Sequence, residues 1–260
     1  MHWDPGQYLQ FGDERGRPFA DLLSRVGAES PRVVVDLGCG PGNLTRSLVL
    51  RWPHAEVEGV DSSPEMVARA EADGATERLR FTVADLREWE PAREVDVLTC
   101  NATLQWVPGH LDLLPRLVSL VRPGGWFAFQ VPGNFGEPSH TAIAALEDSP
   151  RWRQRLVGTD VERPHSEEPA TYLSALVGLG CAADVWETTY LQVLPGPDAV
   201  VRWMTGTGLR PVLGALDEQQ RAEFLDEYRA MVAPAYPQRP YGTVLPYRRI
   251  FAVAQRGDAA

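Results

Sequence analysis

A glycine-rich turn behind a short apolar run is the part of this sequence best suited to bind a cofactor. Val33 to Val35 form the run, and Asp36 ends it. Three glycines then stand at alternate positions: Gly38, Gly40 and Gly42. The run predicts a buried strand of a parallel sheet, and glycines let a ligand approach the backbone of a tight turn. Together with the helical pattern of residues 43–52, the segment predicts a strand–loop–helix unit that binds a nucleotide-like cofactor.

A carboxylate at the end of the next predicted strand favours a cofactor that contains a ribose. Residues 55–61 form this strand, and Asp61 lies near the offset of about 20 residues expected for a ribose-binding acid. An ionised carboxylate can accept hydrogen bonds from both ribose hydroxyls. The spacing G-x-G-x-G differs from the G-x-G-x-x-G of dinucleotide-binding proteins, which disfavours a dehydrogenase. An ordinary glycine turn in an α/β fold is the alternative at this point.

A further acidic residue follows the third predicted strand. Residues 79–83 alternate in polarity as a strand does, and Asp85 comes directly after them. Open α/β sheets bind ligands at the carboxyl ends of their strands, so Asp85 is a second candidate for cofactor binding. A solvated acid in a turn is the alternative.

The remaining periodicities predict strands that alternate with helices. In the first half, strands are expected at 33–35, 55–61, 79–83, 94–100 and 126–131, and helices at 17–26, 43–52, from 64, and at 110–121. Ser62 or Ser63 can cap the third helix, and Ser62 has the spacing of a capping box with Glu65. Five strands alternating with helices predict a doubly wound parallel sheet.

Beyond Pro132 the regular alternation ends. The expected elements are helices at 141–156, 172–180, 198–206 and 217–232, with strands at 184–193 and 249–254. Residues 233–246 form a proline-rich segment between the last helix and the last strand. This half of the chain therefore adds a region of helices to the sheet.

The composition limits the classes of partner. The 260 residues carry a formal net charge of −10, and the pI is about 5.0, which argues against broad binding to nucleic acid. All 25 cationic residues are arginines, so arginine abundance alone is no substrate signal. Cys39, Cys100 and Cys181 lie far apart and predict three small buried residues rather than a disulfide framework or a zinc site. No apolar run approaches the ~18 residues of a membrane span, so the expected location is the cytoplasm. The expected assembly is a monomer.

The order of these segments resembles the core of class I S-adenosylmethionine (SAM)-dependent methyltransferases. The segments that carry the resemblance are 36–42 (DLGCGPG), 59–63 (GVDSS), 84–85 (AD), 101–106 (NATLQW) and 123–125 (PGG). Within this class, the sequence is similar to the trans-aconitate 2-methyltransferases over nearly its whole length. The further segments are 3–5 (WDP), 17–23 (RPFADLL), 104–108 (LQWVP), 129–134 (FQVPGN), 184–188 (DVWET), 206–211 (GTGLRP) and 248–251 (RRIF).

The resemblance implies a fold, an activity and a domain organisation. The fold would be α/β, a Rossmann-like, doubly wound and mostly parallel sheet of seven strands, with an antiparallel last strand and a helical cap inserted after strand five. The implied domains are an N-terminal segment and helix over the active site (1–30), a SAM-binding core (31–132), a helical cap (133–180), and C-terminal strands with substrate-side helices (181–260). The implied reaction methylates a carboxylate of trans-aconitate and releases S-adenosylhomocysteine.

The resemblance also implies which residues bind the cofactor S-adenosyl-L-methionine. They are Asp36, Gly38, Gly40, Gly42, Asn43, Asp61, Ser62, Met66, Asp85, Leu86, Asn101 and Trp106. Within this set, Asp61 would hold the ribose hydroxyls, and Asp85 would accept a hydrogen bond from the adenine amino group. Asn101 and Trp106 would lie near the methionine part of the cofactor.

The chemistry of this reaction needs no general base and no metal. A carboxylate is already ionised at neutral pH, and the sulfonium of SAM makes its methyl group electrophilic. The protein must hold the carboxylate oxygen in line with the methyl group, about 3–3.5 Å away, and exclude water. An arginine bound tightly to the reacting oxygen would hinder attack, so arginines should bind the other carboxylates.

The candidate substrate-binding residues follow from that requirement. They are Tyr8, Gln130, His140, Tyr172, Trp203, Arg210 and Arg248. Arg153, Arg202 and Arg249 are further candidates, with Arg248 preferred over its neighbour because adjacent side chains of a strand point to opposite faces. Residues 1–12, which include Trp3 and Tyr8, are a hypothetical lid over the site. A methyltransferase for another small acid or a secondary metabolite, and a non-catalytic SAM-binding regulator, are the rival interpretations.

Overall fold

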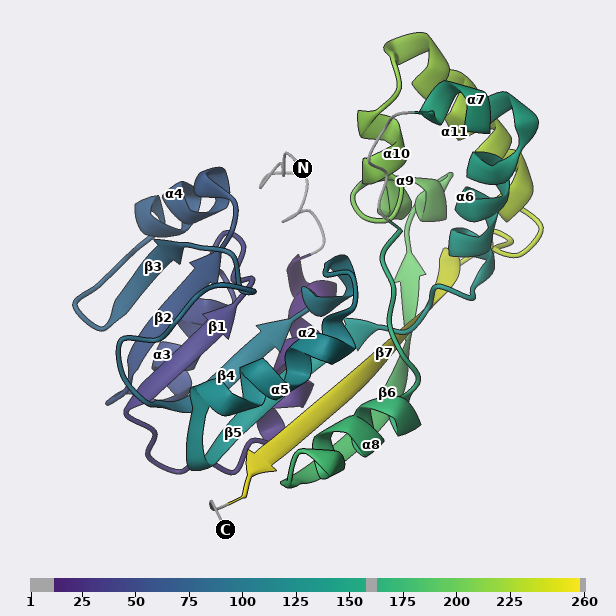
Figure 1. Ribbon diagram of the computed structural model, residues 1–260. Coiled ribbons are helices and arrows are strands. Elements are labelled where there is room, and N and C mark those ends of the chain that lie inside the picture. The colour runs from purple at the N-terminus through teal and green to yellow at the C-terminus, as the bar shows by residue number, and fades with distance from the viewer. Residues whose placement is uncertain (1–11, 158–162, 258–260) are drawn as a thin grey trace. The chain divides into compact units, whose positions relative to one another are not determined.

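A seven-stranded sheet forms the framework of the protein, in the strand order β3-β2-β1-β4-β5-β7-β6 (Figure 1). The computed structural model describes residues 12–157 and 163–257. The strands are β1 (Val33–Leu37), β2 (Glu56–Asp61), β3 (Leu79–Val83), β4 (Val95–Asn101), β5 (Val121–Pro132), β6 (Cys181–Leu194) and β7 (Thr243–Arg256). The seven-stranded α/β fold expected from the sequence is therefore confirmed.

Most of the sheet is parallel. β1 pairs in parallel with β2 and β4, β2 pairs in parallel with β3, and β4 pairs in parallel with β5. β7 runs the other way along β5, as the arrows in Figure 1 show. Two hydrogen bonds define this direction: the backbone N–H of Gly133 donates to Arg248 O over 3.0 Å, and the Arg256 guanidinium donates to Val121 O.

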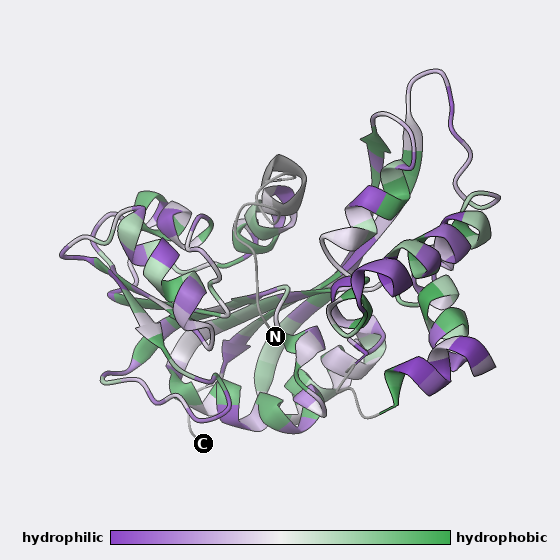
Figure 2. Cartoon of the chain, turned by 90° about the horizontal axis from the view of Figure 1, so that it is seen from above, coloured by the Kyte–Doolittle hydropathy of each residue, from purple (hydrophilic) through white to green (hydrophobic). Residues whose placement is uncertain are grey.

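Helices follow or connect these strands. In chain order they are α2 (Gly12–Ser24), α3 (Thr45–Arg51), α4 (Pro64–Ala72), the 3₁₀ helix η1 (Leu104–Trp106), α5 (His110–Leu120), α6 (Pro138–Asp148), α7 (Pro150–Leu156), α8 (Pro169–Gly178), α9 (Ala199–Thr205), α10 (Arg210–Gly214) and α11 (Glu218–Val232). Figure 2 shows hydrophobic residues concentrated along the strands, whereas the helices carry residues of both kinds. This pattern is typical of helices that cover a buried sheet.

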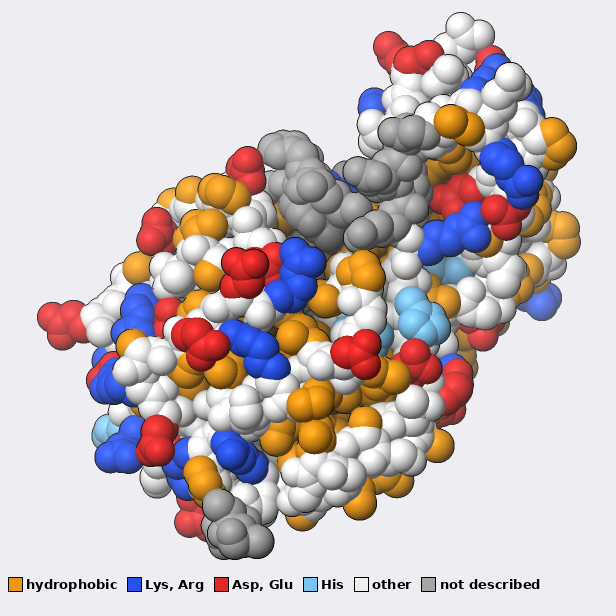
Figure 3. Space-filling view, in the orientation of Figure 1, with side chains coloured by type: hydrophobic (Ala, Val, Ile, Leu, Met, Phe, Trp, Pro, Cys, Tyr) orange, Lys and Arg blue, Asp and Glu red, His pale blue; other side chains and the backbone are white. Residues whose placement is uncertain are grey.

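Many of the arginines that the structure describes have carboxylate partners at the surface. On the face shown in Figure 3, acidic and basic side chains lie interspersed. Arg151, for example, pairs with Glu223 and Glu227, and Arg229 pairs with Asp198 over 2.9 Å. These ion pairs account for much of the arginine content without a substrate role, and exposed pairs of this kind contribute little to stability.

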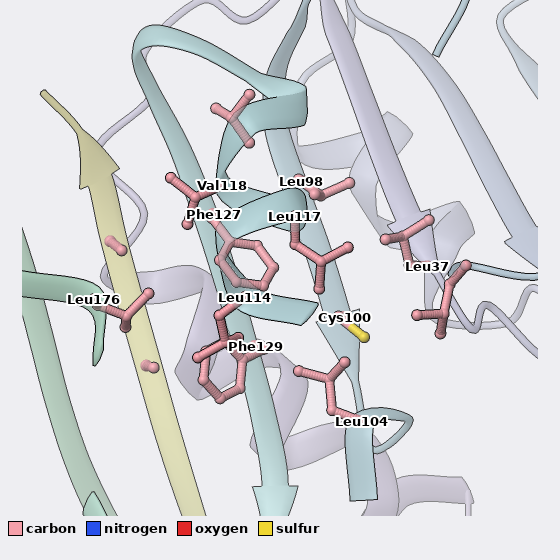
Figure 4. Packing of buried hydrophobic residues seen from close by; sticks show 14 of the residues in the cluster. Leu37, Leu98, Cys100, Leu104, Leu114, Leu117, Val118, Phe127, Phe129 and Leu176 are labelled. Atoms are coloured by element: carbon pink, nitrogen blue, oxygen red, sulfur yellow. The ribbon is translucent and has the colours of Figure 1, made fainter. Parts of the chain in front are cut away.

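One part of the core lies between the central strands and the helices α5 and α8. Leu114 and Leu117 of α5 pack with Phe127 of β5 in one cluster (Figure 4). The same cluster includes Cys100 of β4 and Leu176 of α8. All three cysteines are free and buried, as the sequence predicts. The central strands therefore have the nearly continuous apolar character of a parallel sheet covered by helices.

The chain separates into two compact units. Of the described residues, 12–131, 167–187 and 250–257 form the sheet unit, and 132–157, 163–166 and 188–249 form the helical unit. These boundaries differ from the domains expected from the sequence. α8, expected in the cap at 133–180, belongs to the sheet unit because Tyr172 and Leu176 are part of its core. Residues 188–249 are grouped with the helical unit, although residues 188–194 and 243–249 belong to the strands β6 and β7 of the sheet.

The predicted helix at 141–156 is wrong, because the chain forms two helices there. Pro150 lacks the N–H of a helix interior and disfavours a helical conformation for the residue before it. Ser149 accordingly has φ −65° and ψ 149°, which ends α6, and its hydroxyl accepts a hydrogen bond from Trp152 N at the start of α7. A serine before a proline was the available signal for this boundary.

The last strand is longer than the predicted strand at 249–254. β7 begins at Thr243, inside the proline-rich segment. Thr243, Leu245 and Tyr247 are buried and alternate with partly exposed neighbours, which is the period of a strand. Pro246 masked this alternation in the sequence.

Replacing Leu117 by Ala should destabilise the fold strongly. Leu117 is 0% exposed in the core cluster, so its truncation leaves a cavity and should lower the free energy of unfolding by about 2–5 kcal/mol. Leu50→Ala is the matched control, because Leu50 is 83% exposed and its loss should change stability by less than about 0.5 kcal/mol. Urea denaturation followed by circular dichroism measures both variants, and equal effects would contradict this account of the core.

Candidate functional site

The strand order places the candidate site at the carboxyl ends of β1 and β4. The order 3-2-1-4-5 reverses between these two strands, and ligands of open α/β sheets bind at such a switch point. The glycine loop follows β1, and residues 102–106 follow β4. The two turns are in contact, because the Thr103 hydroxyl donates a hydrogen bond to Gly38 O over 3.3 Å.

The three glycines of the loop are required by its backbone and by its neighbours. Gly38, Gly40 and Gly42 have φ of +72°, +54° and +74°, the left-handed region that favours glycine. A Cβ on Gly38 would lie 2.1 Å from Thr103 Oγ1, and one on Gly42 would lie 2.7 Å from the Phe81 ring. A Cβ on Gly40 would meet none of the described residues within 4 Å. Among these residues the loop therefore packs at both ends and has no neighbour at its centre, where a ligand can approach.

Asp61, at the end of β2, is attached directly to this loop. Its Oδ2 accepts a hydrogen bond from Gly40 N over 2.8 Å, and its Oδ1 accepts one from Ser63 N over 2.9 Å. Burial raises the pKa of Asp61, and the backbone N–H groups act against that rise. Each oxygen keeps a lone pair for a further donor. The position and chemistry agree with the predicted role of Asp61 as an acceptor for ribose hydroxyls.

Asp36 lies beneath the loop rather than at its surface. The residue is 2% exposed, and its carboxylate accepts hydrogen bonds from the hydroxyls of Thr45 (2.6 Å) and Thr99 (3.0 Å). Burial raises its pKa to about 6, while the two hydroxyls lower it in part. Because Thr99 lies on β4 and Thr45 on α3, Asp36 joins β1 to both elements. The side chain of Asp36 therefore has almost no exposed surface with which to make the predicted contact with the cofactor.

Asp85 stands partly exposed after β3, with a cation beside it. Arg87 pairs with its carboxylate over 2.6 Å, and this guanidinium holds the pKa of Asp85 below its usual value. Leu86 is buried next to it. The Asp85 carboxylate is therefore ionised at neutral pH.

The other predicted cofactor residues lie around the same turns. Asn43 is partly exposed directly after Gly42, and Ser62 is exposed directly after Asp61. Met66 is buried in α4, and Trp106 is partly exposed at the end of η1.

The start of α4 is capped by Ser63, one of the two serines that the sequence offers. Its hydroxyl accepts a hydrogen bond from Met66 N over 3.3 Å and donates one to Glu65 over 2.7 Å. The predicted capping box of Ser62 with Glu65 is therefore wrong. The residue that caps the helix is Ser63, one position later. Ser62 is left outside the helix, on the exposed side of the turn.

Asn101 and Gln130 form a side-chain pair at the ends of β4 and β5. Gln130 Nε2 donates a hydrogen bond to Asn101 Oδ1 over 2.9 Å. Gln130 is 1% exposed, so it lies behind Asn101 and supports it. The sequence prediction of Gln130 as a substrate contact is therefore not supported by its placement.

Two residues of the turn after β4 were missed by the sequence analysis. Thr103 holds the glycine loop, as described above, and Gln105 Nε2 donates to Ala102 O over 2.6 Å. The signal was present as a run of polar residues directly after a buried strand. The Oε1 atoms of Gln105 and Gln130 are buried, and no residue that the structure describes donates a hydrogen bond to them.

Tyr172, predicted to contact substrate, lies in the core of the sheet unit. The side chain is 0% exposed and packs edge-on against Phe129. Its hydroxyl oxygen is 2.7 Å from His110 Nε2 and accepts a hydrogen bond from Glu167 N over 3.0 Å. Tyr172 is thus a satisfied core tyrosine, with no surface left for a substrate.

The helical unit contains a small pocket of its own. Its volume is about 110 Å³, and its walls are mostly apolar: Phe135, Ile143, Ala144, Pro164, Gly208 and Pro211. The polar residues of the wall are His140, Glu147 and Arg163. Glu147 and Arg163 form an ion pair over 2.7 Å. Of the three polar residues that line the pocket, His140 is therefore the one outside the Glu147–Arg163 ion pair.

His140 is held rigidly and in its neutral form. Its Nδ1 lies 3.2 Å from the Ser139 hydroxyl, and Phe135 packs edge-on against the ring. Burial, with the charge of Arg249 as a second cause, lowers its pKa to about 4. Its Nε2 lies 3.4 Å from the position that a Cβ on Gly208 would take. A neutral imidazole with Nε2 toward the pocket can offer a hydrogen bond to an acceptor there.

The other substrate candidates of the helical unit differ in exposure. Arg248 is partly exposed and donates to Gly133 O over 3.0 Å. Arg249 is buried over the Tyr247 ring, and Trp203 packs edge-on against the same ring at 1% exposure. Arg210 is partly exposed at the start of α10. Tyr8 and the hypothetical lid at residues 1–12 lie outside the described part of the chain, apart from Gly12.

The described residues contain no group of three or more His, Cys, Asp or Glu side chains arranged to hold a metal ion. Across residues 12–157 and 163–257, no helix combines the length and the apolar character needed to cross a membrane.

Comparison with known proteins places this site in context. A family model described as a methyltransferase domain matches residues 11–174. A trans-aconitate 2-methyltransferase of Streptomyces avermitilis is 53% identical over 98% of this chain and 97% of that protein. One from Streptomyces coelicolor is 51% identical over 99% of this chain and 88% of that protein, and one from Mycobacterium tuberculosis is 47% identical over 99% and 98%.

Solved structures share the fold at low sequence identity. The YcgJ protein of Bacillus subtilis has a TM-score of 0.62 at 14% identity, over 94% of this chain and 99% of that chain. A Haemonchus contortus phosphoethanolamine N-methyltransferase in complex with SAM has a TM-score of 0.57 at 16% identity, over 93% of this chain and 53% of that chain.

The buried Asp36 should make stability depend on pH in a defined direction. Its pKa of about 6 in the folded chain lies above the ordinary 3.8, so its contribution to stability is complete only below the ordinary pKa and is lost as pH rises through 6. Asp36→Asn carries a neutral side chain at every pH. The free energy of unfolding of the wild type, minus that of the variant, should fall by about 2–3 kcal/mol between pH 4 and pH 7. Urea denaturation across this range measures the difference, and a constant value would contradict the assignment.

Proposed function

The chain belongs to the trans-aconitate 2-methyltransferase family, and on this premise we propose that it methylates a carboxylate of trans-aconitate with SAM. The products are the monomethyl ester and S-adenosylhomocysteine. The observation that carries this function is identity at roughly half of all positions, over nearly the full length, with relatives that bear this name.

The residues of the switch point fit the cofactor. No described residue lies near the Cβ position of Gly40, and the neighbouring Asp61 carboxylate suits a ligand with ribose hydroxyls. Asp61 would accept from the ribose hydroxyls and Asp85 from the adenine amino group, while Asn101 and Trp106 would lie beside the methionine part. When bound, SAM supplies a methyl group that its sulfonium makes electrophilic.

The protein's own task is to bind and orient the acid. The carboxylate is ionised near neutral pH, so no residue need remove a proton, and we assign no general base. The non-reacting carboxylates of the acid require donors that hold them without engaging the reacting oxygen. We assign this task to His140, Arg210 and Arg248, and we add Arg249, whose charge lies near His140. Trp203 would act through its packing against Tyr247, the ring over which Arg249 lies.

A methyl-transfer assay tests the function. Purified protein is supplied with SAM and, in separate reactions, trans-aconitate, cis-aconitate, isocitrate or citrate, and the ester is identified by its mass. The highest kcat/KM is expected for trans-aconitate. A higher value for another acid would reassign the substrate, whereas SAM binding without turnover of any acid would support the regulator instead.

Asp61→Asn should weaken cofactor binding. The amide offers one acceptor oxygen instead of two, so Gly40 N and the ribose hydroxyls compete for it. The Kd for S-adenosylhomocysteine, measured by isothermal titration calorimetry, should rise about 10- to 100-fold. Asp73→Asn is the matched control, because Asp73 is an exposed carboxylate paired with Arg69 at the end of α4. An unchanged Kd for Asp61→Asn would remove this residue from the cofactor site.

His140→Leu should impair binding of the acid more than turnover. Loss of a hydrogen bond to a charged group should raise KM for trans-aconitate about 10- to 100-fold, with a smaller change in kcat. His140→Gln should recover part of the loss, because its amide nitrogen approximates the position of imidazole Nε2. The control is His54→Leu, at an exposed histidine of the sheet unit. Unaltered KM in His140→Leu would exclude His140 as a substrate contact.

The location and assembly of the protein complete the proposal. We propose a cytoplasmic enzyme that acts as a monomer on a small anionic substrate, and the acidic charge of the chain argues against a nucleic-acid partner. Gel filtration with light scattering measures the assembly directly, and a dimer mass would correct it.

A further inference from the structure

We infer that Gln130 is a positioning residue, whose side-chain amide orients Asn101 so that Asn101 donates a hydrogen bond to the carboxylate of the bound cofactor. This inference rests on the proposed function for the identity of the cofactor. It assigns Gln130 a role in cofactor binding, although its own side chain is buried.

Asn101 stands at the switch point itself. It is the last residue of β4, and β4 is the strand that pairs with β1 at the reversal of strand order. The residue is partly exposed. Two residues further on, the Thr103 hydroxyl contacts both Asn101 O (3.1 Å) and Gly38 O (3.3 Å). Asn101 is therefore beside the glycine loop and accessible to a ligand that occupies the crevice.

Gln130 holds Asn101 from the opposite side. The two residues are directly paired in the parallel ladder of β4 and β5. Gln130 Nε2 donates to Asn101 Oδ1 over 2.9 Å, and Gln130 O accepts from Ala102 N over 2.9 Å. Ala102 has φ +53°, a conformation that is strained for a residue with a side chain. One buried residue thus fixes both the side chain of Asn101 and the backbone of the turn that follows.

The bond determines which atoms Asn101 presents to the crevice. The oxygen and the nitrogen of an amide lie on opposite sides of Cγ. With Oδ1 directed to Gln130 on β5, Nδ2 is directed away from β5. Asn101 accordingly offers N–H donors rather than an acceptor on the side of the switch point.

An N–H donor at this place selects an anionic group. SAM and S-adenosylhomocysteine carry one anionic group, the carboxylate of the amino-acid arm, and a hydrogen bond to a charged acceptor is roughly twice as strong as one between neutral groups. Gln130 therefore acts on that arm alone. The adenosine part of the ligand makes its contacts elsewhere, at Asp61 and Asp85.

The experiment compares two ligands that differ only in this arm. S-adenosylhomocysteine carries the amino-acid arm, and 5′-methylthioadenosine lacks its amino and carboxylate groups. In Gln130→Glu, an ionised carboxylate can only accept, so the Asn101 amide must turn its nitrogen toward it and its oxygen toward the ligand. Calorimetry should show a rise of about 10- to 100-fold in the Kd for S-adenosylhomocysteine, with the Kd for 5′-methylthioadenosine unchanged within about twofold.

Lowering the pH should restore the lost affinity. A protonated carboxyl in Gln130→Glu donates its O–H to Asn101 Oδ1 and reproduces the original orientation. Burial raises the pKa of a carboxyl at this site, so the recovery should fall within an accessible range of pH. The affinity of the variant for S-adenosylhomocysteine should then rise relative to the wild type as pH falls, and no such trend should appear with 5′-methylthioadenosine. A residue that only supports the fold would not produce this difference.

Two further variants keep the test decisive. In Asn101→Ala, addition of Gln130→Glu should cause no further loss, because the group that Gln130 orients is gone. Gln255→Glu is the matched control, since Gln255 lies on β7 and donates to Gly124 O, away from the switch point. Equal loss of affinity for both ligands in Gln130→Glu, or full additivity with Asn101→Ala, would overturn the positioning role.

This outcome is separable from a failure of the proposed function. If the wild type does not methylate trans-aconitate, the substrate assignment fails while the binding experiments still report on Gln130. If the wild type methylates trans-aconitate and Gln130→Glu affects both ligands equally, the positioning role alone fails.

Discussion

The contact between the turns after β1 and β4 is the constraint on which the site depends. Thr103 lies so close to Gly38 that any side chain at position 38 would collide with it. This proximity requires a glycine, and the glycine allows the left-handed turn that brings Gly40 to Asp61. Asp36, buried below, binds one threonine on α3 and another on β4 and so fixes the same two strands from inside. The crevice is thus defined by backbone packing before any ligand contributes.

Much of the positive charge of the protein is paired with carboxylates at the surface. Every cation of the chain except the histidines and the N-terminus is an arginine, and many of the described arginines bind carboxylates at the surface. Arg249 has a different environment, because it is buried over Tyr247, and its charge adds to the effect of burial in keeping His140 neutral. The proposed tricarboxylate substrate would therefore meet a neutral imidazole donor in addition to the arginines assigned to it.

The sequence allowed prediction of those features that depend on local pattern. The glycine loop, the acids at strand ends and the alternation of strands with helices all follow from spacing and periodicity, and the structure contains them. The sequence does not show which side chains of different strands and helices contact one another. Gln130 and Tyr172 are polar residues near the ends of elements, and only the structure shows that one supports Asn101 and the other bonds to His110 in the core. Ser149 before Pro150 is a local signal for the boundary between α6 and α7. Pro246, by contrast, hides the two-residue period of β7 in the sequence.

The position of β7 between β5 and β6 has a consequence for synthesis of the protein. β6 is the edge strand and its sheet neighbour is β7, which ends only at Arg256. During translation β6 is complete long before its neighbour exists, so its backbone groups lack a partner in the sheet until β7 leaves the ribosome. The sheet unit, which includes residues 250–257, cannot close before then either. The growing chain therefore carries an unpaired strand while α9 to α11 are made, a state in which strands are prone to aggregate.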